Sequence, residues 1–271
     1  MDRLAIEALS VFGLPPVEFV DLAADLDCRR ITVFLQPLAT LGYPPYSLRD
    51  DAALRRDLLA ALKGRDVEIT LGDGILLYPG LDMRTLQTDL DLLATLGVPR
   101  INAIGLDPDL SRTLDQLATV TELAAQRSME TLLEPVPGLP IPDLPTAQVA
   151  LNHVARPDFR LLIDTMHLTR SGATVADLAA VNPTDIGYAQ ISDTTLHPRL
   201  DNYAEEAMYE RLVPGEGELP LSALLAVLPA DIIVGIEVPS RTKALAGVPP
   251  AARLRPCLDA TRALLADLPR Q

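Results

Sequence analysis

The chain has 271 residues, 48% of them hydrophobic, which is enough for a large core in one α/β barrel or in two smaller domains. Its 37 acidic and 23 basic side chains give a formal net charge of -14, and this charge excludes a nucleic-acid partner over most of the surface. No apolar run approaches the roughly 20 residues of a membrane helix, and no signal-like segment opens the sequence, so we expect a cytoplasmic protein with no membrane partner. Cys28 and Cys257 are too few for a disulfide scaffold, and we expect buried thiols.

Eight short apolar runs of β type follow one another along the chain. They are nearly continuous in apolar character, which is typical of strands covered on both faces. The runs are LAIEAL from Leu4, RITVFL from Arg30, VEITLG from Val67, RINAIG from Arg100, METLLE from Met129, RLLIDT from Arg160, IGYAQI from Ile186 and IIVGIE from Ile232.

The segments between these runs have a helical period. Leucine or alanine recurs at intervals of three and four residues in four of them, which predicts amphipathic helices. These helices are expected over Asp50 to Leu62, Asp82 to Leu96, Leu110 to Arg127 and Ala251 to Leu268. Ser47 or Asp50 is expected to cap the first of them, and Gly64 and Gly97 are expected to follow the first and second.

The alternation of strand and helix predicts one (β/α)₈ TIM barrel, an eight-stranded parallel barrel with outer helices, in a single domain spanning residues 1–271. A doubly wound sheet would offer a glycine-rich turn after its first strand, but EALSVFGLPP contains no G-x-G-x-x-G. The 24 prolines gather where loops are expected, so they indicate stiff loops around the barrel mouth rather than disorder.

Four of the later runs end on a group that can ligate a metal, namely Glu134, Asp164, Gln190 and Glu237. The carboxyl ends of barrel strands meet at one mouth, so we expect these side chains to share a site. Three carboxylates and an amide form an oxygen-rich pocket suited to a divalent cation. His167 follows Asp164 by three residues, and we expect its imidazole to face the substrate.

Each of these assignments has a plainer alternative. Glu134 could be a solvated rim glutamate, although a carboxylate at the end of an apolar strand is costly without a cation. His167 could be a structural histidine. Gln190 could hydrogen-bond neighbouring loops, in which case Asp193 is either the ligand or a residue that holds a ligand. Glu237 repeats the arrangement of Glu134, and two such glutamates on the fifth and eighth strands are suited to moving a proton.

Two arginines are candidates for substrate binding. Arg211 precedes the PGEGELP turn and Arg241 follows Glu237, so either guanidinium could bind an anionic or hydroxyl group of a substrate. The alternatives are a surface arginine for Arg211 and charge balance for Arg241. His197 and Asp201 lie in a long segment after the seventh strand, which could contact substrate or serve as a lid. We expect His153 to be structural.

Aromatic side chains are scarce, at 4% of residues with no Trp, so broad stacking platforms for sugar rings are not expected. A small or open-chain substrate fits this composition better than an oligosaccharide. A modest aromatic wall is expected from Phe12, Phe34, Tyr43, Tyr46 and Tyr78.

The segments LLEPV, IDTMH, AQISD, PGEGELP and GIEVPS together resemble the xylose-isomerase-like TIM-barrel superfamily of sugar isomerases and epimerases, over essentially the whole chain. The resemblance implies a divalent ion, Mn²⁺ or Mg²⁺ first and Co²⁺ or Zn²⁺ as alternatives, held by Glu134, Asp164, Gln190 and Glu237. It also implies that the two glutamates exchange protons with a keto-sugar. The residue matching Gln190 is histidine in many members and glutamine in those similar to hydroxypyruvate isomerase.

The chemistry explains these residue types. A proton beside a carbonyl is too weakly acidic for a carboxylate to remove unless the developing enediolate is stabilised, and a divalent Lewis acid provides that stabilisation. Returning the proton gives isomerisation or epimerisation of a small keto-sugar or hydroxy-ketone. Loss of a β-hydroxyl would instead give a dehydratase of the 3-dehydroshikimate dehydratase type. A non-catalytic metal-binding barrel and a homo-oligomer both stay open, whereas three histidines and an acidic surface argue against a three-zinc DNA endonuclease.

Overall fold

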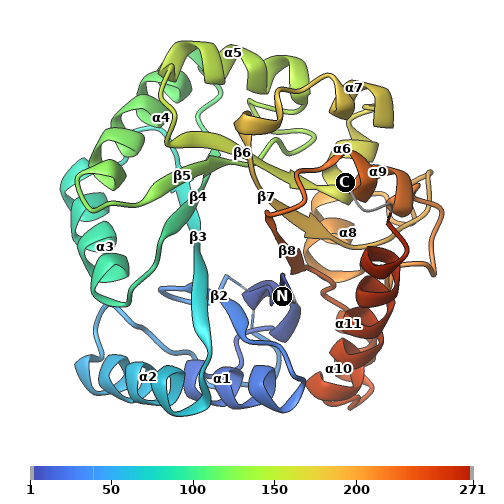
Figure 1. Cartoon of the computed structure of the whole chain (residues 1–271). Coiled ribbons are helices and arrows are strands. Elements are labelled where there is room, and N and C mark those ends of the chain that lie inside the picture. Colours follow the sequence, from blue (N-terminus) through green and yellow to red (C-terminus); the bar gives the residue numbers. More distant parts are fainter. Residues whose placement is uncertain (1–2, 39, 269–271) are drawn as a thin grey trace.

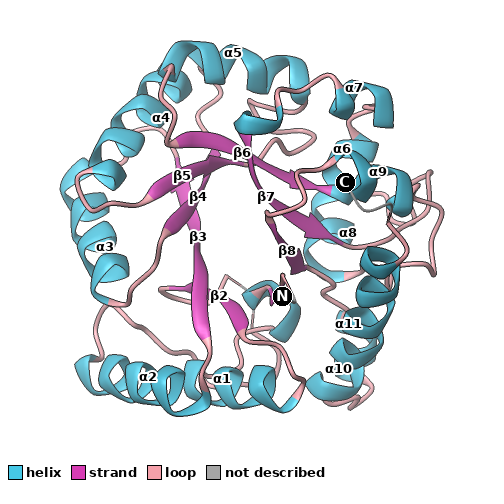
Figure 2. Ribbon diagram, viewed as in Figure 1, coloured by secondary structure: helices cyan, strands magenta, loops and turns pink. Residues whose placement is uncertain are grey.

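The computed structural model describes residues 3–38 and 40–268; residues 1–2, 39 and 269–271 of the predicted domain lie outside this description. Eight parallel strands close into one barrel in chain order, with the last strand paired to the first. Helices surround this ring of strands (Figures 1 and 2). The predicted (β/α)₈ barrel is therefore confirmed.

Each of the eight predicted apolar runs overlaps one strand. β6 begins one residue before its predicted run, and β3 continues five residues beyond its run to a length of 10 residues. They are β1 (Leu4–Ile6), β2 (Arg30–Phe34), β3 (Glu68–Leu77), β4 (Arg100–Gly105), β5 (Glu130–Leu133), β6 (Phe159–Asp164), β7 (Ile186–Ile191) and β8 (Ile233–Ile236).

The long helices expected from periodicity are present, and shorter ones occupy the segments between and after the later strands. The α-helices are α1 (Pro16–Asp25), α2 (Ala52–Arg65), α3 (Met83–Thr95), α4 (Leu110–Ala125), α5 (Leu144–Val154), α6 (Thr165–Arg170), α7 (Val175–Ala179), α8 (Tyr203–Tyr209), α9 (Leu221–Val227), α10 (Arg241–Leu245) and α11 (Pro250–Ala266). Two 3₁₀ helices, η1 (Ala8–Val11) and η2 (Pro183–Asp185), complete the described elements. Among the residues described, no helix combines the length and apolarity required to cross a bilayer.

The ends of α2 differ from the prediction. Neither Ser47 nor Asp50 is the N-cap, because the Asp51 carboxylate accepts hydrogen bonds from the backbone N–H groups of the first turn. Gly64 lies inside the helix, which ends one residue later at Arg65, before Asp66 adopts the left-handed conformation (φ 55°). The prediction for Gly97 is confirmed, since it follows α3 with a φ of 76°.

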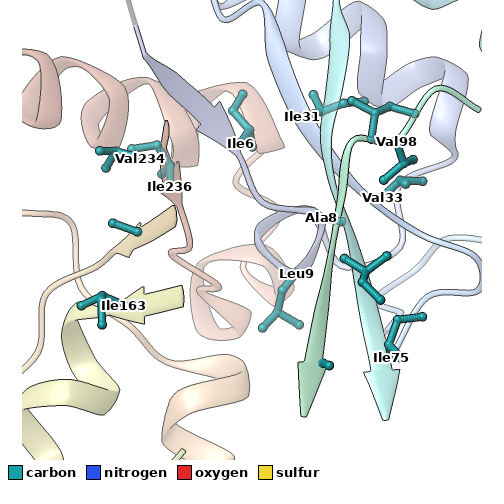
Figure 3. Close-up of a cluster of buried hydrophobic side chains, with 14 of the residues drawn as sticks. Ile6, Ala8, Leu9, Ile31, Val33, Ile75, Val98, Ile163, Val234 and Ile236 are labelled. Carbon is teal, nitrogen blue, oxygen red and sulfur yellow. The ribbon is translucent and has the colours of Figure 1, made fainter. Parts of the chain in front are cut away.

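The main core fills the space between the strands and the surrounding helices. Figure 3 shows part of it, including Ile6 of β1, Ile31 of β2 and Ile236 of β8, which lie on paired strands although they are far apart in sequence. Cys28 and Cys257 are both buried and free, as expected.

A second, smaller apolar cluster of Leu71, Leu132, Leu162 and Tyr188 comes from β3, β5, β6 and β7. Side chains two residues apart on a strand point to the same face, so these four share the face of Asp73, Glu134, Asp164 and Gln190, two residues further along. The alternation therefore stacks a layer of polar groups directly on a layer of fully buried apolar side chains at the carboxyl end of the barrel.

Gly235 of β8 provides a test of this packing, because the Glu7 carboxyl group lies where a side chain would be. A Cβ atom added at Gly235 would stand 1.6 Å from Glu7 Oε1 and 3.0 Å from the Tyr188 hydroxyl. We expect Gly235→Ala to lower the free energy of unfolding by about 1–3 kcal/mol, measured by urea denaturation. The control is Gly64→Ala in α2, where a Cβ has no neighbour within 4 Å; this change should stabilise by up to about 1 kcal/mol. Equal stability of the two variants would contradict the packing described here.

Candidate active site

The four predicted metal ligands come together at the carboxyl ends of β5 to β8. Glu134 directly follows β5, Asp164 is the last residue of β6, Gln190 lies near the end of β7 and Glu237 directly follows β8. Gln190 is in register with Asp164 on one side and with Gly235 on the other. All four side chains are buried, with exposed fractions of 0–6%.

Arg211 lies between two of these residues. Its guanidinium contacts Asp164 Oδ2 at 2.5 Å and Glu237 Oε2 at 2.9 Å, so that one cation bridges β6 and β8. The third guanidinium nitrogen, Nε, donates to the Ala207 carbonyl at 2.7 Å and fixes the side chain against α8. Burial raises the pKa of Glu237, as do the nearby carboxylates, against the opposing charge of Arg211. Burial also acts to raise the pKa of Asp164, but the charges of Arg211 and His167 outweigh it and the pKa is lowered.

His167 connects Glu134 to helix α8 above the barrel. Its backbone N–H donates to Asp164 Oδ1 at 2.7 Å, because Asp164 is the N-cap of α6. Its Nε2 lies 3.3 Å from Glu134 Oε1, and its Nδ1 contacts the Tyr203 hydroxyl on α8. Glu134 is also held from the other side, since Asn102 Nδ2 donates to its Oε2 at 2.6 Å.

Two more buried carboxyl groups share this mouth. Glu7, directly after β1, accepts hydrogen bonds from the Tyr188 hydroxyl at 2.8 Å and from Gln190 Nε2 at 3.3 Å. Asp73 of β3 accepts from Asn102 Nδ2 at 3.1 Å. Burial, followed by the charge of Asp73, raises the pKa of Glu7 to about 8. Burial, followed by the charge of Glu134, raises the pKa of Asp73 to about 7.

Sequence reasoning missed Glu7, Asp73, Asn102 and Tyr203. The first three carry a usable signal, because each is a polar residue at an inward-facing position of an otherwise apolar strand. The rule that selected Glu134 and Asp164 would have selected them too. Tyr203 carries no such signal, since its place depends on how the long segment after β7 folds back over the mouth.

The residues fit a divalent cation in their donor chemistry. Gln190 Oε1 is buried and has no hydrogen-bond partner among the residues described, which leaves one oxygen of the proposed ligand set available. Ligand atoms of Glu134, Asp164 and His167 lie within 4.8 Å of one another, and those of Glu7, Asp73 and Glu237 form a second such group. The carboxylates are therefore arranged in two neighbouring groups, and Arg211 bridges Asp164 of one to Glu237 of the other.

Several predicted contacts lie elsewhere. Arg241 does not line the cavity at this mouth; its guanidinium pairs with Glu205 and lies over the Tyr209 ring, 4.4 Å from the ring centroid. A substrate contact by Arg241 has no support in this geometry. Asp193 accepts hydrogen bonds from the backbone of Thr194, Gly215 and Leu219, so it holds the PGEGELP turn.

The other two histidines, His153 and His197, lie outside the group of residues at the barrel mouth. His153 is on α5, where its Nε2 is 3.1 Å from Asp115 on α4, in agreement with a structural role. His197 lies in the segment after β7, and its carbonyl accepts from Arg170. Within that segment the structure forms α8, which the sequence did not predict as a helix.

A cavity of about 570 Å³ opens above these groups. Glu134, His167, Arg211 and Glu237 line it, together with Asp73. The prediction of an aromatic wall from the sequence is wrong for most of the five residues. Only Phe34 of the five aromatic residues lines this cavity; Tyr78 lines a neighbouring one, and Phe12 is buried against Tyr209.

Comparisons with known proteins agree with this architecture. The profile of the xylose isomerase-like TIM barrel family matches residues 20–263. None of the curated protein sequences matches the chain. The solved structure of the IOLI protein with a bound zinc atom has a TM-score of 0.81 at 16% identity, covering 99% of this chain and 100% of that one.

Two enzymes have a similar fold. The probable 3-DHS dehydratase AsbF from Bacillus anthracis has a TM-score of 0.74 at 16% identity, covering 97% of this chain and 99% of that one. L-ribulose 3-epimerase has a TM-score of 0.74 at 15% identity, with coverages of 98% and 95%. At these identities the likeness shows the fold alone. Because the family profile spans most of the sequence, the chain belongs to the xylose isomerase-like TIM barrel family.

Proposed function

We propose that this protein is a divalent-metal-dependent isomerase or epimerase that moves a proton next to the carbonyl of a small keto-sugar or hydroxy-ketone. The observation that carries the proposal is that Glu134 and Glu237, from strands β5 and β8, line the same cavity with His167 and Arg211. Two carboxylates that line one cavity from separate strands can remove and return a proton on a bound substrate.

The proposed ligands of the ion are Glu134, Asp164, Gln190 and Glu237. The unpartnered Gln190 Oε1 and the excess of buried carboxyl groups over cationic side chains support this set. Oxygen donors of this kind favour Mg²⁺ or Mn²⁺, with Co²⁺ or Zn²⁺ as alternatives. When bound, the ion would act as a Lewis acid that lowers the cost of the negative charge developing on the carbonyl oxygen.

The chain's own groups orient the substrate. His167 is held by Tyr203 at Nδ1, which leaves Nε2 beside Glu134, where it can donate a hydrogen bond to a substrate oxygen. Arg211 bridges the Asp164 and Glu237 carboxylates and fixes the position of both. Asn102 fixes the Glu134 carboxylate through Oε2 and leaves Oε1 for proton transfer.

A dehydratase is the second candidate function. This reaction needs one further group that donates a proton to the leaving hydroxyl, and the cavity contains a candidate for that group. Asp73 lines the same cavity, and its pKa of about 7 keeps a substantial fraction of it protonated near neutral pH. Analysis of the products, as rearranged or dehydrated compounds, separates the two reactions.

The test of the proposed chemistry is hydrogen–deuterium exchange in D₂O. Ketoses, keto-acids and cyclic hydroxy-ketones are incubated with the metal-loaded protein, and exchange beside the carbonyl is followed by NMR. We expect Glu134→Gln and Glu237→Gln to reduce the exchange rate by at least about 10²-fold, because each removes one proton acceptor. Glu122→Gln, a matched change at an exposed position of α4, should leave the rate unchanged. Normal exchange in either site variant would refute its assigned role. Metal binding without exchange of any compound would favour a non-catalytic barrel.

The position of Arg211 predicts a link between metal and stability. Removing this cation leaves the Asp164 and Glu237 carboxylates buried without their partner. We therefore expect Arg211→Met to destabilise the metal-free protein by about 3–5 kcal/mol. Added Mn²⁺ should raise the melting temperature of this variant by more than it raises that of the unmodified protein, as measured by calorimetry. The control is Arg56→Met, at an exposed position of α2. An equal metal effect in all three proteins would contradict the proposed ligand set.

A further inference from the structure

The cavity has two unlike halves. The residues proposed for proton transfer and substrate orientation come from the β5–β8 part of the ring. They are Glu134, His167, Arg211 and Glu237. The facing part of the ring is built from β1 to β4, which form the opposite side of the barrel (Figure 1). Apart from Asp73 and Gly74, the lining residues supplied by this facing part are aliphatic or aromatic.

The apolar half consists of Leu9, Phe34, Leu76, Ile104 and Leu106, with Leu38 at its edge. Leu76, Ile104 and Leu106 are only half-buried, and none of them belongs to the core clusters. Aliphatic surface that faces an open cavity is stabilised when an apolar ligand covers it.

The roof of the cavity is also largely apolar; its polar residue Asn202 accepts hydrogen bonds through Oδ1 from the first turn of α8. Ala204, Ala207 and Met208 of α8 line it from above, and Val136 lines it from the loop after β5. The Tyr203 hydroxyl, also in the roof, is already engaged with His167. The roof therefore offers a ligand mainly hydrocarbon contacts.

The polar groups of the lining are largely committed to one another. All three nitrogens of Arg211 have protein partners, in Asp164, Glu237 and the Ala207 carbonyl. Asp73 Oδ1 accepts from both Gly74 and Asn102. A sugar with hydroxyls along its length would press several of them against leucine and isoleucine side chains, which cannot hydrogen-bond, and such burial is unfavourable.

We propose that the substrate is a hydroxy-ketone whose body is aliphatic or alicyclic, rather than a polyhydroxylated sugar. Its polar head would lie against Glu134, His167 and Glu237, and its hydrocarbon body against Leu76, Ile104 and Leu106. The placement of the head rests on the proposed function, whereas the identity of the body rests on the apolar wall alone.

A neighbouring cavity indicates the direction in which the hydrocarbon body of the proposed substrate would extend. This second cavity, of about 280 Å³, shares Phe34, Leu38 and Leu76 with the first, together with Asp73 and Gly74, and continues to Leu81 and Leu86. Its lining also includes the ion pair of Arg49 with Asp89. A longer hydrocarbon body therefore finds apolar surface past β3 at Leu81 and Leu86, beside this ion pair.

The experiment compares compounds with the same head. 1-Hydroxy-2-butanone, 1-hydroxy-2-pentanone and 1-hydroxy-2-hexanone add methylenes one at a time, and erythrulose carries two extra hydroxyls on the four-carbon skeleton. Affinity is measured by titration calorimetry on the metal-loaded protein, and exchange in D₂O is measured in parallel. We expect each methylene to tighten binding about threefold, and erythrulose to bind at least about tenfold more weakly than 1-hydroxy-2-butanone.

A variant of the wall links the effect to this half of the cavity. Leu76→Asn should weaken binding of 1-hydroxy-2-hexanone by at least about fivefold and change erythrulose binding by less than about twofold. Leu59→Asn, at an exposed position of α2, should change neither affinity.

The two readouts separate the two proposals. Exchange of erythrulose at least as fast as that of the alkyl compounds, with no gain from added methylenes, would overturn the apolar-body proposal and leave the proposed chemistry standing. Affinity that rises with chain length in the absence of any exchange would support the apolar body and overturn the proposed chemistry. Failure of every alkyl compound to bind would overturn the apolar-body proposal.

Discussion

The arrangement at the barrel mouth depends on neutralising negative charge away from water. Glu7, Asp73, Glu134, Asp164 and Glu237 are all buried at one end of the barrel, and Arg211 is the guanidinium set directly among them. Carboxylates removed from water must be protonated, paired or bound to a cation. Protonation is available to Glu7, Asp73 and Glu237, whose pKa values are raised, and pairing to Asp164, whose pKa is lowered. A divalent ion would satisfy several of these groups together.

The apolar layer beneath the site affects the strength of the electrostatic interactions between these charged groups. Leu71, Leu132, Leu162 and Tyr188 fill the barrel two residues below the polar layer, so the carboxyl groups have hydrocarbon on one side and the cavity on the other. Such a floor keeps the local dielectric low and strengthens every interaction between charges above it. The same strand alternation therefore produces both the packed interior and the raised pKa values of Glu7, Asp73 and Glu237 above it.

The fold was predictable because its signal is repeated eight times, and an error at one boundary does not affect the count of strands. The shared position of Glu134, Asp164, Gln190 and Glu237 followed from the same geometry, because each ends an apolar run. The side-chain pairing was not predictable. Arg211 and Arg241 have equivalent sequence signals, yet one bridges two buried carboxylates and the other pairs with Glu205 at the surface. That difference depends on how residues after β7 and β8 fold back over the barrel, and local periodicity holds no information about such long-range packing. The prediction of an aromatic wall was largely wrong for the same reason.

The division of the mouth between two halves of the polypeptide affects how this protein could be altered. Segments up to residue 106 supply the hydrocarbon side, whereas the carboxylates, imidazole and guanidinium of the opposite side follow residue 130. An exchange of Ile104 or Leu106, which are half-buried and outside the core clusters, would change the apolar wall without replacing any acid or base of the site. Ligand selectivity and proton chemistry could then be adjusted separately within one small scaffold, by changing apolar wall residues up to Leu106 and keeping Glu7, Asp73 and the residues after 130.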